Sequence, residues 1–368
     1  MTTDQQHFDS YFKSRGGLFD FKAVGGNALL RKILDSFNNQ IKRNNSENSK
    51  LVIPHIDIIN NNELNACAAK SNSKYFIGFY LGAVYVLKDI FYRMLSNKSI
   101  LPNIGVIDNE TNPIIFNAQI TSLNQLFLAK DPDEQIIPKD PVRMVYADVL
   151  HSHALNFLLD HEYAHISHGH VDYITAQFNA NTLWEISQES SMETLFSQTL
   201  EMDADCSAVN SGIATILEAY QKSSFLPVHL RQYYSNFDES LVSWCIAIYT
   251  FFRIFSFADD HKKDIKTQTH PNSGLRQSIV MATIATILNE KFNSRILDNF
   301  VKNIGRITDT VEEAFSAISH QDYNPIAFYN AFRPEAQEHV HYLMKNWNNV
   351  RPLLEPLAMK NLPPLNND

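Results

Sequence analysis

The chain contains 368 residues, 44% of them hydrophobic, which is enough apolar material to fill one large domain or two smaller ones. A formal net charge of -9 excludes nucleic acid or an anionic membrane as the main partner. The three cysteines, Cys67, Cys206 and Cys245, are far apart, so no disulfide framework and no CxxC zinc site is present. The first residues, MTTDQQHFDSYF, lack the basic and apolar segments of a signal peptide, so we expect a cytoplasmic protein.

The N-terminal part of the chain predicts a helix followed by a small sheet. The helix is expected over residues 28–43, after a glycine pair, and the polar sequence NNSENS follows it. Three apolar runs of strand length come next, at residues 51–59, 64–69 and 75–79. The third run passes through Gly82 into a helix that ends near Leu95.

The segment 97–141 differs from the rest of the chain because it holds five prolines. Proline cannot donate a backbone hydrogen bond and breaks helices and strands. The segment therefore predicts irregular structure, with one short helix near residues 122–128.

A long helix is expected directly after this segment. Residues 142–167 contain neither Pro nor Gly, and their apolar side chains recur at helical spacing. Pro141 suits the first turn of a helix, and Gly169 provides a stop signal. The helix carries the sequence His-Glu-Tyr-Ala-His, so His161 and His165 lie one turn apart on the same face.

Two neutral imidazoles at this spacing can bind one Zn²⁺ and leave positions for a third ligand and a water. Glu162, beside the first histidine, can take a proton from that water, as in HExxH metallopeptidases. The alternative is a histidine-rich helix without a metal. His151 and His153 lie about 80° from the metal-facing stripe, so we expect them on the helix surface or in packing.

A third zinc ligand has to come from another part of the chain. Glu201 and Asp205 occur in the sequence LEMDADC, one helical turn apart. Glu201 would complete a His/His/Glu set, and Asp205 could accept the outer N–H of a ligand imidazole. The alternative is a solvated acidic helix that begins near residue 193.

His168 and His170 are rival candidates for the third ligand. They follow the HExxH motif closely, but a metzincin pattern would have a glycine at His168 and a histidine at Val171, so Gly169 and His170 are each one residue out of register. The Cα atoms of His161 and His168 would be about 10 Å apart on a helix, too far to converge on one ion without bending. We therefore favour Glu201 and expect His168 to be a pocket-wall or capping residue.

The combined motifs resemble those of gluzincin metallopeptidases. HEYAHISHGH followed by EMDAD is similar to the HExxH…ExxAD signature of CAAX prenyl endopeptidases and their bacterial heat-shock relatives. Residues 65–68, Asn-Ala-Cys-Ala, resemble the strand upstream of HExxH in that group, and residues 270–276 resemble its HPxxxxR element. The match covers about residues 50–290. In size and in lacking obvious membrane helices, the chain looks more like the Lit-type phage-exclusion peptidases.

The resemblance implies further site residues. His270 would lie near the cleft as a donor to the tetrahedral oxyanion, and Arg276 would be a structural or substrate-orienting partner. The alternative for His270 is a turn residue before Pro271. In zinc peptidases of this type, an edge of the small sheet holds the extended substrate by backbone pairing.

The rest of the chain predicts helices and no membrane span. The strong helix candidates in this part of the chain are residues 192–220, 238–257 and 275–292. More helices are expected over residues 293–349. The tail from Pro352 contains several prolines, and we expect it to wrap the surface. The apolar stretches 76–87 and 241–258 are too short or too charged for a span of about 20 residues.

These observations predict an α+β, mostly helical, zincin-like fold in which the active-site helix packs on a small sheet. The expected domains are an N-terminal helical arm (1–48), a gluzincin-like metallopeptidase domain (49–292) and a C-terminal helical extension (293–368). The predicted function is that of an endopeptidase with one Zn²⁺ per chain, acting on a protein or peptide substrate. Its resemblance implies a bacterial stress or phage-defence role. The alternatives are a zinc hydrolase of a non-peptide amide and a non-catalytic zinc-binding regulatory protein.

Overall fold

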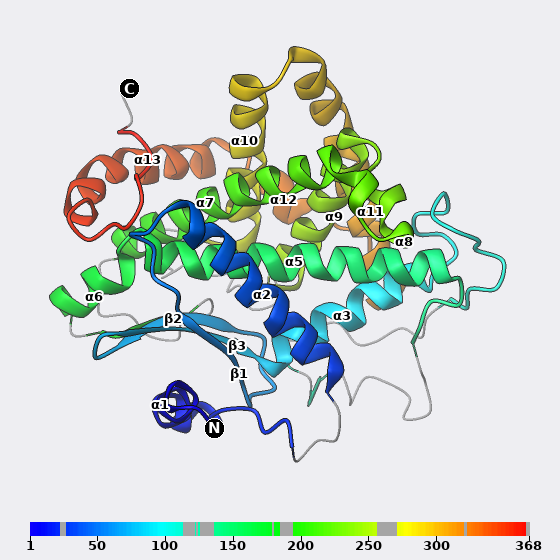
Figure 1. The fold of residues 1–368 in the computed structure, drawn as a ribbon. Helices are drawn as coiled ribbons and strands as arrows, with labels where there is room; N and C mark the ends of the chain where they lie inside the picture. Colours follow the sequence, from blue (N-terminus) through cyan, green and yellow to red (C-terminus); the bar gives the residue numbers. More distant parts are fainter. Residues whose placement is uncertain are drawn as a thin grey trace.

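The computed structural model describes residues 1–22, 27–112, 122, 124–125, 136–178, 180–184, 194–255, 271–319 and 322–365 (Figure 1). The fold is α+β and mostly helical, as predicted, with helices arranged around one small mixed sheet. The strands are β1 (His55–Ile59), β2 (Ala66–Ser71), β3 (Lys74–Tyr80) and β4 (Thr182–Trp184). The α-helices are α1 (Thr3–Phe12), α2 (Ala28–Glu47), α3 (Leu81–Leu95), α5 (Pro141–Ser167), α6 (His170–Phe178), α7 (Thr194–Gln221), α8 (Val228–Arg231), α9 (Phe237–Phe255), α10 (Ser273–Lys291), α11 (Ser294–Ser319), α12 (Ile326–Asn330) and α13 (Pro334–Leu354).

The sheet has the strand order β1-β3-β2-β4. β1 pairs with β3 in parallel, whereas β2 runs antiparallel to both of its neighbours, β3 and β4. The three strands predicted from the sequence are all present. β4 was not predicted, because a three-residue strand is too short to show an apolar period.

The two faces of the sheet have different partners. On β2, Ala66 and Ala68 join the main core with α2, α3 and α5, whereas Cys67 and Ala69 point to a second cluster built with Phe8 of α1. This alternation follows from the two-residue period of a strand. Figure 1 shows α1 on one side of the sheet and α5 on the other. The sheet is therefore covered on both faces.

The helix α5 lies at the centre of the molecule. It contacts β2 and β3 on the sheet side and packs against α3, α7 and α9 (Figure 1). Between Leu150 and Ser167 every side chain is buried except Ser152, which is exposed, and Asn156, which is half-buried, so α5 is buried on nearly all sides. A helix held in this way is a rigid platform for side chains that must be placed accurately.

The two long apolar stretches form core elements. Residues 76–87 run from β3 into α3, and 241–255 form most of α9. Within the described part of the chain, none of the helices combines the length and apolar character that crossing a membrane requires. The short helix expected near 122–128 lies largely outside the described residues.

The C-terminal segment after α13 returns to the junction of α5 and α6. The backbone N–H of Met359 donates to the carbonyl of Ser167 at 2.8 Å, and Lys360 Nζ donates to Ser207 Oγ of α7 at 3.0 Å. Leu362 is buried. The tail therefore does more than cover the surface as predicted, because it contributes a cationic side chain to the packing around α7.

Candidate metal centre

The helix α5 begins and ends at local signals in the sequence. Asp140 caps its N-terminus, accepting from the N–H groups of Val142 at 2.9 Å and Arg143 at 3.0 Å, and Pro141 follows in the first turn. At the other end Gly169 adopts a left-handed conformation with φ of 81°. Both boundaries agree with the sequence prediction. They place the HExxH segment in the last two turns of α5.

The helix α7 supplies three carboxylates. Glu201, Asp203 and Asp205 are 1%, 3% and 0% exposed, respectively. The interpretation of this segment as a solvated acidic helix is therefore wrong. Ionised carboxylates withdrawn from water require hydrogen-bonding or charged partners, and each of the three has histidine partners on α5 or α6.

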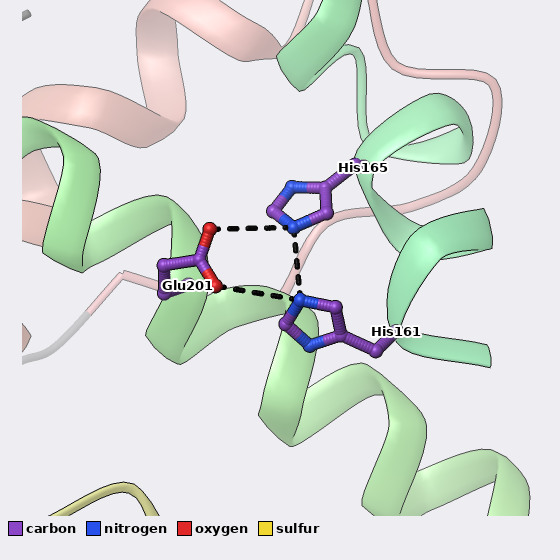
Figure 2. A group of neighbouring side chains, drawn as sticks. All are labelled: His161, His165 and Glu201. Atoms are coloured by element: carbon purple, nitrogen blue, oxygen red, sulfur yellow. Dashed lines mark hydrogen bonds and ion pairs between the residues drawn. The ribbon is translucent and has the colours of Figure 1, made fainter. Parts of the chain in front are cut away.

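The ligand atoms of His161, His165 and Glu201 converge on one point (Figure 2). The two Nε2 atoms are 3.0 Å apart, and the Glu201 oxygens lie 3.4 Å from Nε2 of His161 and 3.5 Å from Nε2 of His165. Zinc bonds of about 2.0–2.1 Å in a tetrahedral site place ligand atoms about 3.3 Å apart. The donor types and their separations therefore fit a Zn²⁺ ion.

Asp205 contacts the outer nitrogen of the first histidine. Its Oδ1 atom is 2.9 Å from His161 Nδ1, and Arg276 donates to both carboxylate oxygens, from Nε and Nη2, at 2.8 Å each. Burial raises the pKa of Asp205, but the Arg276 charge and hydrogen bonds and the His161 contact outweigh it, so its pKa is below the usual value. An ionised Asp205 can accept the Nδ1–H of His161, which leaves the Nε2 lone pair directed at the point where the ligand atoms converge.

Glu162 is buried next to His161, and its carboxylate interacts electrostatically with a residue of β2. Burial raises the pKa of the Cys67 thiol on β2, and the nearby Glu162 carboxylate raises it further. The candidate general base thus lies on α5 close to β2, which contains residues 66–68 of the predicted strand. His270 is outside the described residues, which resume at Pro271, whereas Arg276 lies in the first turn of α10.

His168 and His170 join a different carboxylate. His168 Nδ1 and His170 Nε2 both contact Oδ2 of Asp203, the latter at 3.0 Å. His170 Nδ1 also lies 2.9 Å from Nδ1 of His165. His168 and His170 therefore contact Asp203, and His170 also contacts the outer nitrogen of His165, on the side of that ring away from Glu201. Asp203 was not predicted as a site residue, because residues that are two apart on a helix point about 200° away from each other and Glu201 was already expected to face the histidines.

Residues 128–294 match the sequence model of the family Peptidase U49. The match to Peptidase U49, the Lit-type peptidases, supports a metallopeptidase family and a hydrolase that acts on proteins. It spans α5, α7 and α10, the three helices that supply the described site residues. No curated protein and no solved structure matches the chain.

Proposed function

We propose that the protein is a zinc-dependent endopeptidase that hydrolyses peptide bonds of a protein substrate. One observation carries the proposal, namely the convergence of His161, His165 and Glu201 at tetrahedral ligand spacing beside Glu162. The match to Peptidase U49 over the same helices supports a protein as the substrate. The donor set of two imidazoles and one carboxylate is that of zinc peptidases, which leave a position open for water.

The roles of the side chains follow from their positions. When bound, Zn²⁺ would act as a Lewis acid that lowers the pKa of a water and polarises the scissile carbonyl. Glu162 accepts a proton from the attacking water and delivers it to the leaving amine. Asp205, held by Arg276, keeps the lone pair of His161 Nε2 directed at the ligand position. The burial of these groups strengthens each electrostatic interaction, because little water is present to screen it.

The small sheet is the proposed place for an extended substrate. At the outer edge of β1, the N–H of Phe19 donates to the carbonyl of Ile58 and the N–H of Asn60 donates to the carbonyl of Gly17, both at 2.9 Å. The backbone of residues 17–19 therefore already pairs with that edge. At the opposite edge the last strand among the described residues is β4, which pairs with β2 from Cys67 to Ala69. We infer that a substrate peptide pairs along β4, where backbone hydrogen bonding favours extended sequences.

The substitution Glu162→Gln tests the mechanism. Glutamine keeps the shape of the side chain but cannot accept the water proton, so turnover should fall by roughly 10²–10⁴-fold while zinc content stays the same. The measurement compares new protein N-termini in a lysate treated with wild type or variant, with zinc determined by elemental analysis of the same samples. Glu218→Gln, at an exposed Glu–Lys pair on α7, is the matched control and should leave both quantities unchanged.

Three results would contradict the proposal in different ways. Equal cleavage by wild type and Glu162→Gln at equal zinc content would exclude Glu162 as the general base. Zinc without any new protein N-termini would favour a non-peptide amide substrate or a non-catalytic zinc protein. Full zinc content in both His161→Ala and His165→Ala would show that the metal binds elsewhere.

A further inference from the structure

The outer nitrogen of His165 has an unusual partner. In most metal sites the non-ligating N–H of a histidine donates to a carboxylate, a backbone carbonyl or water. His161 follows this pattern through Asp205, but His165 Nδ1 lies 2.9 Å from Nδ1 of a second imidazole, His170. His170 in turn contacts Asp203 through Nε2 at 3.0 Å. His165, His170 and Asp203, from α5, α6 and α7, are 1%, 0% and 3% exposed.

The row of His165, His170 and Asp203 allows a single arrangement of protons on its two neutral imidazole rings when His165 binds a metal. If His165 binds a metal through Nε2, a neutral ring must carry its proton on Nδ1. His165 then donates to His170 Nδ1, so the neutral His170 must carry its own proton on Nε2. That proton is directed at Asp203 Oδ2, which is ionised and accepts it. Every nitrogen in the row then has a compatible partner.

We propose that His170 and Asp203 are positioning residues for His165, a relay that fixes its tautomer and orients its ring toward the metal. The inference rests on the proposed metal at His161, His165 and Glu201. The two ligand histidines are thus held by different means. His161 contacts a carboxylate directly, whereas His165 reaches one through an intervening imidazole.

The charge around Asp203 supports this role. His168 Nδ1 and His170 Nε2 both contact the same oxygen, Asp203 Oδ2, the latter at 3.0 Å. Burial lowers the pKa of His168, so this ring donates as a neutral imidazole to the same oxygen. The Lys360 ammonium lies close enough to interact with Asp203. Asp203 is therefore an anion with two N–H donors and a nearby cation.

A second metal ion at His168, His170 and Asp203 is the competing interpretation, because their ligand atoms also lie within 4.8 Å of one another. It conflicts with the proton count. A metal on His170 Nε2 would place the His170 proton on Nδ1, pointing at the proton that His165 needs on its own Nδ1. The charge of Lys360 beside Asp203 also disfavours another cation.

Zinc affinity of purified, metal-depleted protein tests the relay, measured by competition with a chromophoric chelator. His170→Leu removes the acceptor, and Asp203→Asn removes the negative charge that holds His170. Each should weaken zinc binding by about 10–100-fold, the usual effect of losing a hydrogen-bond partner of a metal ligand. His170→Gln should restore most of the affinity, because its amide oxygen can accept from His165 while its NH₂ donates to Asp203.

The control is His153→Leu, which removes a buried histidine from α5, the helix that holds His161 and His165, at a position away from the ligand atoms. It should lower stability without changing zinc affinity. If the role of His170 were purely structural, His170→Leu would, like this control, lower the stability and leave the zinc affinity unchanged. Side-chain nitrogen NMR of zinc-loaded wild type should also show the proton of His165 on Nδ1.

The outcomes separate this inference from the proposed function. Failure of wild type to bind zinc at all would overturn both. One zinc per wild-type chain with unchanged affinity in His170→Leu and Asp203→Asn would overturn the relay and leave the proposed function standing. Two zinc ions per wild-type chain, one of them lost in His170→Leu, would establish the second metal site in place of the relay.

Discussion

At the scale of single residues, histidines on the same helix have different environments. On α5, His161 and His165 turn toward carboxylates of α7, whereas His151 and His153 are buried with no carboxylate partner among the described residues. His151 Nε2 contacts the carbonyl oxygen of Val84 at 3.0 Å. Burial lowers the pKa of His151 to about 3 and that of His153 to about 4. These two rings are therefore neutral packing residues, one of the two roles that their angular positions predicted.

This burial predicts a dependence of stability on pH. Folded His151 stays neutral below pH 6.5, whereas in the unfolded chain it takes up a proton, so acidification favours unfolding until the pH falls below the folded pKa of about 3. In metal-free protein, His151→Gln should remove this contribution, of at most about 1.4 kcal/mol per pH unit between pH 6 and pH 3. Urea unfolding of both proteins at several pH values measures it, and parallel pH profiles would contradict it.

The residues of the site were predictable to different extents. His161, Glu162 and His165 are recognisable because a helix converts a spacing of four into a shared face, and the same rule paired Glu201 with Asp205. His170 and Asp203 were not assigned to His165, because their contact depends on the sharp turn at Gly169 and on how α6 packs against α7. Such angles between helices are set by tertiary packing and leave no periodic signal in the sequence.

At the scale of elements, the turn between α5 and α6 determines where the relay lies. Gly169 has a φ of 81°, and a Cβ atom there would lie 2.7 Å from Cβ of Leu357 in the C-terminal segment. Both the backbone conformation and the space favour glycine. The sequence predicted a stop at this position, but it did not predict that a second helix starts immediately and carries His170 back toward α7.

Gly169→Ala should therefore destabilise the protein. A non-glycine residue in the left-handed region costs about 1–3 kcal/mol, and the clash with Leu357 adds to this cost. Gly305→Ala is the matched control, because Gly305 lies within α11 with no heavy atom within 4 Å of an added Cβ. That substitution should stabilise the chain by about 0.4–1 kcal/mol. Equal effects in denaturant unfolding would show that the turn is not constrained as described.

At the scale of the whole molecule, the candidate site is supported by a segment far from it in the sequence. Residues 293–368 are the proposed C-terminal extension, and they include Lys360. This side chain donates a hydrogen bond to Ser207, and its charge interacts with that of Asp203. The family match ends at residue 294, so it does not cover this contribution. Composition and motifs predicted the fold class and the central helices. They could not predict which surface the tail would contact, because that contact depends on a few single side chains, such as Lys360 and Leu362, that form no repeating pattern.

A chain truncated after Glu355 tests the role of the tail. It lacks the Met359 and Lys360 hydrogen bonds and the buried side chain of Leu362, whose burial alone is worth about 1.5–3 kcal/mol. We expect a lower melting temperature and weaker zinc retention. The control is a chain truncated after Leu365, which keeps these contacts. Identical melting and zinc content in the two truncated chains would show that the tail is dispensable.

The late position of Lys360 in the sequence has a consequence for protein synthesis. The ribosome makes α5 and α7 well before it adds the tail, so a growing chain holds HExxH and Glu201 while the surroundings of Asp203 are still unfinished. Completion of those surroundings thus awaits the synthesis of Lys360. In the proposed zinc peptidase, chains that end before this residue would lack part of the support for metal binding, which would limit proteolysis by such shorter chains. Stalled chains of increasing length, assayed for zinc retention, would reveal this order of assembly.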